Sequence, residues 1–117
     1  MDRAERTLRT AQTIIDDPDS AFILAYDAAR HACTGVLAHQ RLRPTTTGGH
    51  YVVEEVLRAQ FGNAFREFGA LRRRRNESEY PTRPGDDVAP EEAAAAIETT
   101  TRLIEAARKL THNLSMF

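Results

Sequence analysis

The residues best suited to chemistry lie in one short segment, residues 71–81, with the sequence LRRRRNESEYP. Arginine can pair with a carboxylate or phosphate through two parallel hydrogen bonds, while asparagine and tyrosine can bond an anion or a base. Burial of an unpaired charge is costly, so a helical stripe that turns from aromatic to charged should end at water, a paired acid or an anionic ligand. Such a stripe, at alternating spacings of four and three, comprises Phe61, Phe65, Phe68, Arg72, Arg75 and Glu79.

The charged residues of this segment also have structural interpretations. Arg72–Arg75 occupy four consecutive positions and so point all around a helix, and we expect Arg73 and Arg74 to be solvated surface charges. Glu79 follows Arg75 by four residues and can be its counter-ion within the helix. The cluster therefore has two interpretations that the sequence leaves open, a ligand-binding surface or a set of structural ion pairs.

Asn76 and Tyr80 have the same two interpretations. Asn76, together with Arg75, can pair with an acid on a neighbouring helix and fix the register of a bundle or a dimer. Tyr80 precedes Pro81 and can seal the end of the helix with its ring while its hydroxyl reaches a partner. Alternatively, both side chains can contact a phosphate or a base.

The elements that must position these residues are predicted to be helices. Apolar residues recur with the helical period along the chain, and no segment alternates with the two-residue period of a strand. Short connections between amphipathic helices favour antiparallel neighbours. We predict an all-α fold, an up-and-down bundle of four to five helices that forms a single domain over residues 1–117.

The first two predicted helices are separated by Asp16-Asp17-Pro18, because proline disfavours the helical conformation of the residue before it. We expect Asp19 or Ser20 to cap the second helix, which runs to about Gln40 and is central to the core. The apolar stripe of the first helix is Ala4, Leu8, Ala11 and Ile15. The stripe of the second is Phe22, Ala25, Tyr26, Ala29, Cys33, Val36 and Leu37.

Three further helices are predicted. A loop over residues 41–49 precedes a short third helix at about 52–60, and Gly62-Asn63 marks a kink before a fourth helix from Ala64 to about Glu79. Pro90 at a first helical position, with acids in the following turn, indicates the start of the last helix. The inner face of this last helix is predicted to be Ile97, Thr100, Ile104, Ala107, Thr111 and Leu114, flanked by Leu103 and Leu110.

In this order of elements the chain resembles the HEPN superfamily, and within it the small actinobacterial-type members that end in an Arg-Asn-x-x-x-Tyr motif. The resemblance covers about residues 20–112. It implies an all-α bundle, usually paired through the face that bears the arginine motif, and often a metal-independent ribonuclease of bacterial toxin–antitoxin, defence or RNA-processing systems. The features that carry it are Ala25-Tyr26-Asp27-Ala28-Ala29-Arg30, Leu42-Arg43-Pro44, Gly48-Gly49-His50-Tyr51 and residues 71–81.

The resemblance also implies roles for particular residues. In active members an arginine is followed a few residues later by a histidine; Arg75 and Asn76 occupy the start of that motif, and Tyr80 stands where the histidine is expected. A free histidine exchanges a proton near neutral pH, whereas tyrosine, with a pKa of about 10, stays almost fully protonated. Tyr80 is thus a poor general base. His50, at a helix start, can supply the proton if the fold brings it near Arg75, or can simply cap the helix.

Two functional hypotheses follow. The first is a non-catalytic, homodimeric module that binds RNA, a nucleotide or a partner protein such as a nucleotidyltransferase-like protein. The second is an active metal-independent endoribonuclease in which Arg75 stabilises the phosphate transition state, Asn76 orients, and Tyr80 or His50 transfers the proton. The candidate contact residues for binding are Arg72, Arg75, Asn76, Glu79, Tyr80 and His50.

Composition excludes several other classes of protein. With 16 basic and 17 acidic residues the formal net charge is −1, which argues against coating nucleic acid by bulk attraction. His31 and His39 lack metal-ligand spacing, so we expect no metal and no cofactor. Cys33 lies among small and apolar residues and is expected to be a buried thiol. No apolar run approaches a membrane span and the N-terminus is charged, so we expect a cytoplasmic protein.

Overall fold

The computed structural model describes residues 2–42, 62–63, 66–77 and 87–115. Within these ranges all regular secondary structure is helical, which confirms the predicted all-α class. The helices are α1 (Asp2–Thr13), α2 (Pro18–Leu42) and α4 (Pro90–Ser115), together with helical segments at residues 62–63 and 66–77. The predicted third helix at 52–60 lies outside the described residues.

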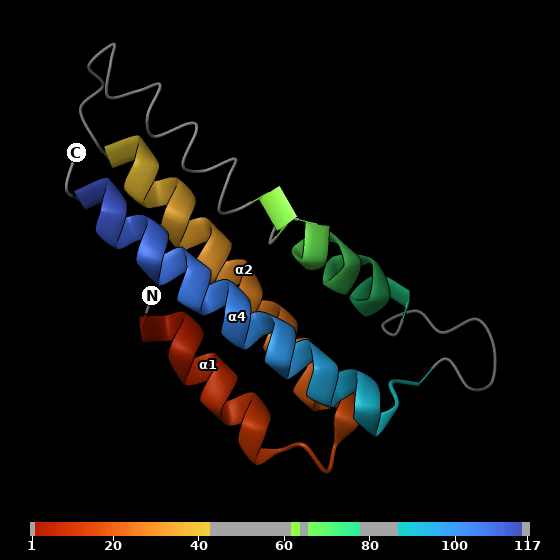
Figure 1. Cartoon of the computed structure of the whole chain (residues 1–117). Coiled ribbons are helices and arrows are strands. Elements are labelled where there is room, and N and C mark those ends of the chain that lie inside the picture. Colours follow the sequence, from red (N-terminus) through yellow and green to blue (C-terminus); the bar gives the residue numbers. More distant parts are fainter. Residues whose placement is uncertain (1, 43–61, 64–65, 78–86, 116–117) are drawn as a thin grey trace.

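The described helices alternate in direction, as predicted for an up-and-down bundle (Figure 1). α2 and α4 lie side by side and run the same way, and α1 packs against both of them in the opposite direction. The helix at 66–77 runs antiparallel to α4, because Glu67 faces Arg102 at 3.9 Å while Arg74 reaches back to Glu92. The segment with the arginine cluster therefore approaches the N-terminal end of α4.

Small side chains dominate the interior between these helices. Most of the fully buried positions are alanines, which let helix backbones approach closely, and Leu103, Leu110 and Val36 are the largest apolar side chains that are fully buried. Thr100 is fully buried as well, and its hydroxyl donates a hydrogen bond of 3.1 Å to the carbonyl oxygen of Ala25. The Thr100 hydroxyl thus links α4 to α2, and the other buried residues that the structure describes in these two helices are apolar.

The connection between α1 and α2 differs from its prediction. α1 ends at Thr13, so Ile14 packs against the core and Ile15, predicted to continue the apolar stripe, is 37 % exposed. Asp17 caps α2: its carboxylate accepts hydrogen bonds from the Ser20 backbone N–H and hydroxyl. The predicted caps, Asp19 and Ser20, are wrong, because Pro18 occupies the first helical position, where its missing N–H costs nothing.

The start of α4 agrees with its prediction. α4 begins at Pro90, and the N–H of Ala93 donates to the carbonyl oxygen of Ala89 at 3.1 Å. Glu92 reaches back and accepts a hydrogen bond of 3.4 Å from the backbone N–H of Ala89. This carboxylate satisfies one of the orphan donors at the helix start, as the glutamate of a capping box does.

Two further predictions concern the membrane and the cysteine. No helix among the described residues combines the length and the apolar character that a bilayer crossing requires. Cys33 is buried in α2, and burial raises the pKa of its thiol to about 11. This confirms the predicted buried thiol, which is protonated and unreactive at neutral pH.

Candidate functional site

The helix at 66–77 carries the arginine cluster and is oriented by two apolar side chains. Leu71 is buried in the core cluster and Phe68 packs against it, whereas Arg72 is exposed. The predicted stripe continues from Phe68 to Arg72 and was expected to end at water, a paired acid or an anionic ligand. In the structure Leu71 occupies the inner position, and Arg72 faces water. Arg75 lies on the inner side at the next turn and is half-buried.

Arg75 lies on an aromatic stack that connects this helix to α2. The rings of Phe68 and Tyr26 are stacked with centroids 5.5 Å apart and an interplanar angle of 5°. The guanidinium carbon of Arg75 is 5.5 Å from the centroid of the Tyr26 ring. A guanidinium over an aromatic face gains a cation–π attraction. Tyr26 is itself buried, so the stack gives Arg75 a defined position at the edge of the core.

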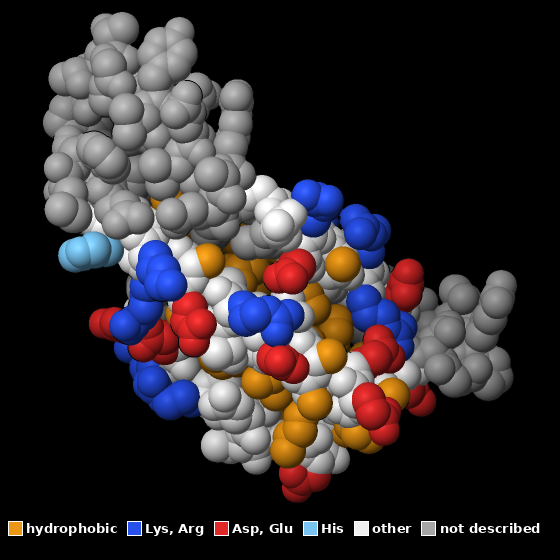
Figure 2. Space-filling view, viewed as in Figure 1, with side chains coloured by type: hydrophobic (Ala, Val, Ile, Leu, Met, Phe, Trp, Pro, Cys, Tyr) orange, Lys and Arg blue, Asp and Glu red, His pale blue; other side chains and the backbone are white. Residues whose placement is uncertain are grey.

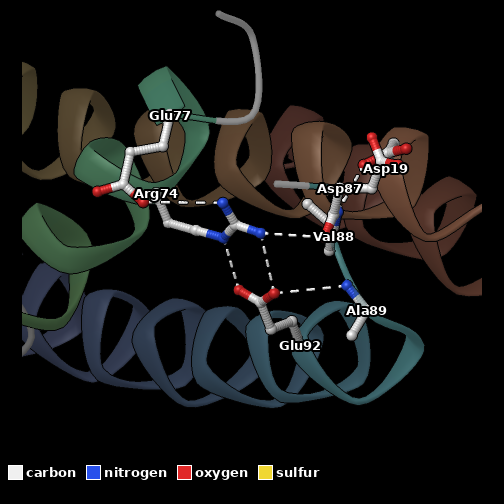
Figure 3. Close-up of polar contacts among 7 residues, drawn as sticks. All are labelled: Asp19, Arg74, Glu77, Asp87, Val88, Ala89 and Glu92. Atoms are coloured by element: carbon white, nitrogen blue, oxygen red, sulfur yellow. Dashed lines mark hydrogen bonds and ion pairs between the residues drawn. The ribbon is translucent and has the colours of Figure 1, made fainter. Parts of the chain in front are cut away.

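Arg74 points toward α4 (Figure 3). Its Nε donates to one carboxylate oxygen of Glu92 at 2.7 Å, and its Nη2 donates to the other at 3.0 Å. Nη2 also donates to the carbonyl oxygen of Asp87 at 3.2 Å, and Nη1 lies 3.7 Å from Glu77. The expectation that Arg74 is a solvated charge is therefore wrong: its side chain is only 22 % exposed and is engaged by a two-pronged ion pair.

The residues around Arg74 connect three elements, and we call this group the Arg74 junction: Arg74, Asp87, Val88, Glu92 and Asp19. Asp19, in the first turn of α2, accepts a hydrogen bond of 2.9 Å from the backbone N–H of Val88 (Figure 3). The hydrogen bond from Arg74 lowers the pKa of Glu92 below its usual value, and the Ala89 N–H adds to this effect while burial opposes it. The starts of α2 and α4 and the arginine helix thus meet at one end of the bundle.

The opposite side of the helix faces solvent, and we call it the arginine face. Its members are Arg66, Arg72, Arg73 and Asn76, all of them exposed. Arg72 and Asn76 are four residues apart, as are neighbours on one side of a helix, and Arg73 lies between them and Arg66 around the axis. Arg73 is exposed as predicted. The exposed acid next to this face is Glu77, whose carboxylate lies near Arg74.

Elsewhere on the described surface the charges alternate in sign. Figure 2 shows acidic and basic side chains interspersed over the face it views, in keeping with a chain of formal net charge −1. Several charges of the described surface form ion pairs, such as Arg102 with Glu98 at 3.3 Å and Arg30 with Asp27 at 3.8 Å. The concentration of arginines on the arginine face is therefore a local feature.

The predicted site residues fall into two groups. Arg72, Arg75 and Asn76 are described, on one helix, with Arg72 and Asn76 exposed and Arg75 half-buried. Glu79, Tyr80 and His50 lie outside the described residues. Their roles as counter-ion, hydrogen-bonding group and proton donor stay predictions.

The other titratable groups of the described residues form no metal site. In residues 2–42, 62–63, 66–77 and 87–115, no group of histidines, cysteines and acids has an arrangement that can hold a metal ion. Burial and the nearby charges of Arg3 and Arg30 lower the pKa of His31, and Asp27 acts in the opposite direction. His31 is therefore mostly neutral near pH 7.

Sequence reasoning missed the partnership of Arg74 with Glu92. Glu92 was recognised as a first-turn acid of the last helix, and Arg74 as one of four arginines, but they are 18 residues apart. The only local signal was the position of Glu92 three residues after the cap, where a carboxylate turns back over the helix start.

A family model for the HEPN domain matches residues 1–110. The match reaches further toward the N-terminus than the residues that carried the resemblance and includes all of α1. Comparisons with curated proteins and with solved structures gave no match.

Proposed function

The chain belongs to the HEPN domain family, and from this premise we propose that it is a homodimeric, non-catalytic module that binds RNA through the arginine face. The observation that carries the proposal is the exposure of Arg66, Arg72 and Arg73 beside Asn76 on one side of a single helix. Guanidinium groups fit phosphate oxygens through paired hydrogen bonds, and an exposed amide can bond a base edge or a ribose hydroxyl.

The chemistry of this face favours RNA over a partner protein. A stable protein interface usually has an apolar or aromatic centre surrounded by polar groups. The exposed side chains that the structure describes on this helix are arginine, asparagine, glutamate and one alanine, Ala70. Such a surface gains more from phosphate groups than from the burial of apolar area.

Arg75 supports the same proposal from the edge of the face. Its guanidinium rests on Tyr26, so little side-chain freedom is lost when it contacts a ligand. The tyrosine at position 80, in place of the histidine that the resemblance leads one to expect, supports binding without cleavage, because tyrosine is a poor proton acceptor at neutral pH.

HEPN domains commonly dimerise, and the resemblance implies pairing on the side that bears the arginine motif, so a dimer would place its two arginine faces along a shared groove for one RNA. Two linked faces raise the effective affinity for a ligand long enough to reach both. We therefore propose a homodimer, and sedimentation or light scattering on the purified protein measures its mass directly.

The test is RNA binding by purified protein in EDTA, measured by fluorescence anisotropy with labelled tRNA and single-stranded RNA. The variant Arg72→Ala/Arg73→Ala removes two guanidinium groups from the arginine face. Arg6→Ala/Arg9→Ala removes two exposed arginines from α1 and is the matched control for net charge. We expect the first variant to weaken binding by about tenfold or more and to reduce its salt dependence, while the control stays near wild type.

Three outcomes would overturn parts of this proposal. Equal losses in the two double variants would mean that the arginine face is not the contact surface. A wild-type protein that binds neither RNA would favour the partner-protein hypothesis, with a nucleotidyltransferase-like protein as the candidate. RNA cleavage in EDTA that disappears in Arg75→Ala would establish the endoribonuclease instead and make Tyr80 and His50 the next residues to substitute.

A further inference from the structure

Arg74 and Glu92 form a polar contact between the arginine helix and α4 that the proposed RNA contact does not use. We infer that they are a positioning pair: their ion pair sets the rotation of the helix at 66–77 and thereby the direction in which the arginine face meets RNA. This inference rests on the proposed function for its consequence, and on the geometry of the Arg74 junction for its mechanism.

The geometry of the pair is directional. Both oxygens of Glu92 accept hydrogen bonds from Arg74, from Nε at 2.7 Å and from Nη2 at 3.0 Å. Two parallel bonds between a planar guanidinium and a planar carboxylate fix orientation as well as distance, which a single bond from a lysine would not. The contact therefore restrains the angle of the helix about its axis.

A second anchor restrains the same helix on its other neighbour. Arg75, the next residue, lies over the ring of Tyr26 in α2, and Phe68 stacks on that ring about two turns earlier along the helix. Consecutive helical residues point in directions about 100° apart, so Arg74 and Arg75 reach different partners. One contact with α4 and one with α2 together fix the orientation of the arginine helix about its axis.

The acceptor side of the pair is itself held in place. Glu92 also accepts the N–H of Ala89, and Asp19 of α2 accepts the N–H of Val88. Arg74 additionally bonds the carbonyl oxygen of Asp87, immediately before these residues. Rotation of the arginine helix away from this position would break the two hydrogen bonds from Arg74 to Glu92 and the one to Asp87 (Figure 3).

The same contacts argue that Arg74 does not bind RNA directly. Its Nε and Nη2 are directed to Glu92 and Asp87, and its Nη1 faces Glu77. A carboxylate in contact with the guanidinium cancels most of the attraction that a phosphate would feel. Arg72 and Arg73, on the exposed side, are the residues that the pair would orient.

The direction in which one substitution changes RNA affinity distinguishes a positioning role of Arg74 from direct contact with RNA. Glu92→Gln removes a negative charge while its amide oxygen can still accept the Ala89 N–H. If Arg74 contacted RNA, this variant would release its guanidinium and strengthen binding. If the pair positions the helix, Glu92→Gln and Arg74→Ala each weaken binding, by about tenfold, and the double variant is no weaker than Arg74→Ala alone.

Glu91→Gln is the matched control, because Glu91 is exposed in the same helical turn and carries the same charge. We expect it to leave RNA binding unchanged or slightly stronger. Arg74→Lys keeps the positive charge and should recover only part of the affinity, since lysine cannot form the two-pronged contact. Affinities are compared at a temperature where circular dichroism shows every variant to be folded.

A readout without RNA separates this inference from the proposed function. The Arg75 side-chain Nε–H signal of ¹⁵N-labelled protein, assigned by its loss in Arg75→Ala, reports the position of that group over the Tyr26 ring. We expect it to shift in Arg74→Ala and Glu92→Gln, and to stay in place in Glu91→Gln and Arg73→Ala. An unmoved signal in the first two variants, or tighter RNA binding by Glu92→Gln, would overturn the inference even if the protein binds RNA. A shifted signal in a protein that binds no RNA would uphold positioning and reject the proposed ligand.

Discussion

Two of the contacts that hold α4 in the bundle differ in the kind of interaction that makes them. Along its length, the described buried residues of α4 are apolar, with Leu103 and Leu110 as the largest fully buried side chains, except for Thr100, which bonds Ala25 of α2. At its start the contacts are polar and only partly buried, made by Arg74, Glu92 and the backbone of Asp87.

The difference shows what each contact contributes. Burial of apolar area is strong but non-directional, so the α2–α4 interface supplies stability and tolerates small rotations. A bidentate ion pair near water contributes little net stability, but it fixes the orientation of the two groups relative to each other. The four predictions below test this division, from the largest expected effect to the smallest.

Leu103→Ala is expected to have the largest effect on stability. Leu103 is 1 % exposed, so truncation removes apolar contact and leaves a cavity, at a cost of about 2–5 kcal/mol in the free energy of unfolding. Ile15→Ala is the control, because Ile15 is 37 % exposed and should cost less than about 1 kcal/mol. Urea unfolding followed by circular dichroism measures both. Equal losses of unfolding free energy in the two variants would contradict the view that buried apolar residues of α4 supply stability.

Arg74→Ala is expected to cost about 1–2 kcal/mol, toward the low end for charged hydrogen bonds because water reaches the pair. Arg73→Ala, the exposed neighbour, should change stability by less than about 0.5 kcal/mol. The cost of Arg74→Ala should shrink in 1 M salt, which screens exposed charges, whereas that of Leu103→Ala should not. If the stability lost in Arg74→Ala did not depend on salt, the Arg74 junction would stabilise the protein through apolar packing and not through charge.

Thr100→Val examines the polar atom inside the apolar interface. Valine keeps the branched shape and removes the hydroxyl that bonds the Ala25 carbonyl oxygen, so we expect a loss of about 1 kcal/mol. Thr101→Val is the matched control: the Thr101 hydroxyl bonds Ile97 within its own helix and should cost less. If the two variants were equal, the hydrogen bond between α2 and α4 would add nothing to the packing.

The pH dependence of the junction is expected to be the smallest effect, since the Glu92 side chain is 40 % exposed. The hydrogen bond from Arg74 lowers the pKa of Glu92 from its ordinary 4.5, so between the two values the unfolded chain binds more protons than the folded protein. The stabilisation is complete above the unfolded pKa and is lost as pH falls through the folded pKa.

The measurement is the difference in unfolding free energy between wild type and Glu92→Gln. It should be largest near pH 7, decline below the ordinary carboxyl pKa of 4.5, and be close to absent in the Arg74→Ala background at any pH. A difference that stays constant into the acid range would contradict the assigned role of the Arg74 contact.

The fold followed from the sequence where local rules act alone. Pro90 marked the start of α4 and the apolar repeat marked the inner residues of α2, because both signals depend only on neighbours along the chain. The end of α1 was less well predicted. The helix ends at Thr13, before the predicted stripe does, so Ile14 packs against the core and Ile15 is exposed. The position of this end depends on the balance between turn and packing energies.

The helical conformation of residues 66–77 was predicted correctly, whereas the direction of the Arg74 side chain was not. The arginines of this helix were recognised from residue type and spacing, yet Arg74 was expected to be a solvated charge and is instead held by Glu92. Stripes offset by one residue are nearly equivalent in a run of four arginines, and only the neighbouring helices distinguish them.

By itself the sequence determined that this chain is all-α, that Cys33 is buried, and that arginines gather on one helix, because helical periodicity and residue type are local properties. It also carried the resemblance to the HEPN family that the match over residues 1–110 confirms. Only the tertiary structure decided which arginine is anchored and which are presented. Glu92 and Tyr26 come from other helices, and the direction of a long side chain depends on the charges and rings that the fold places around it.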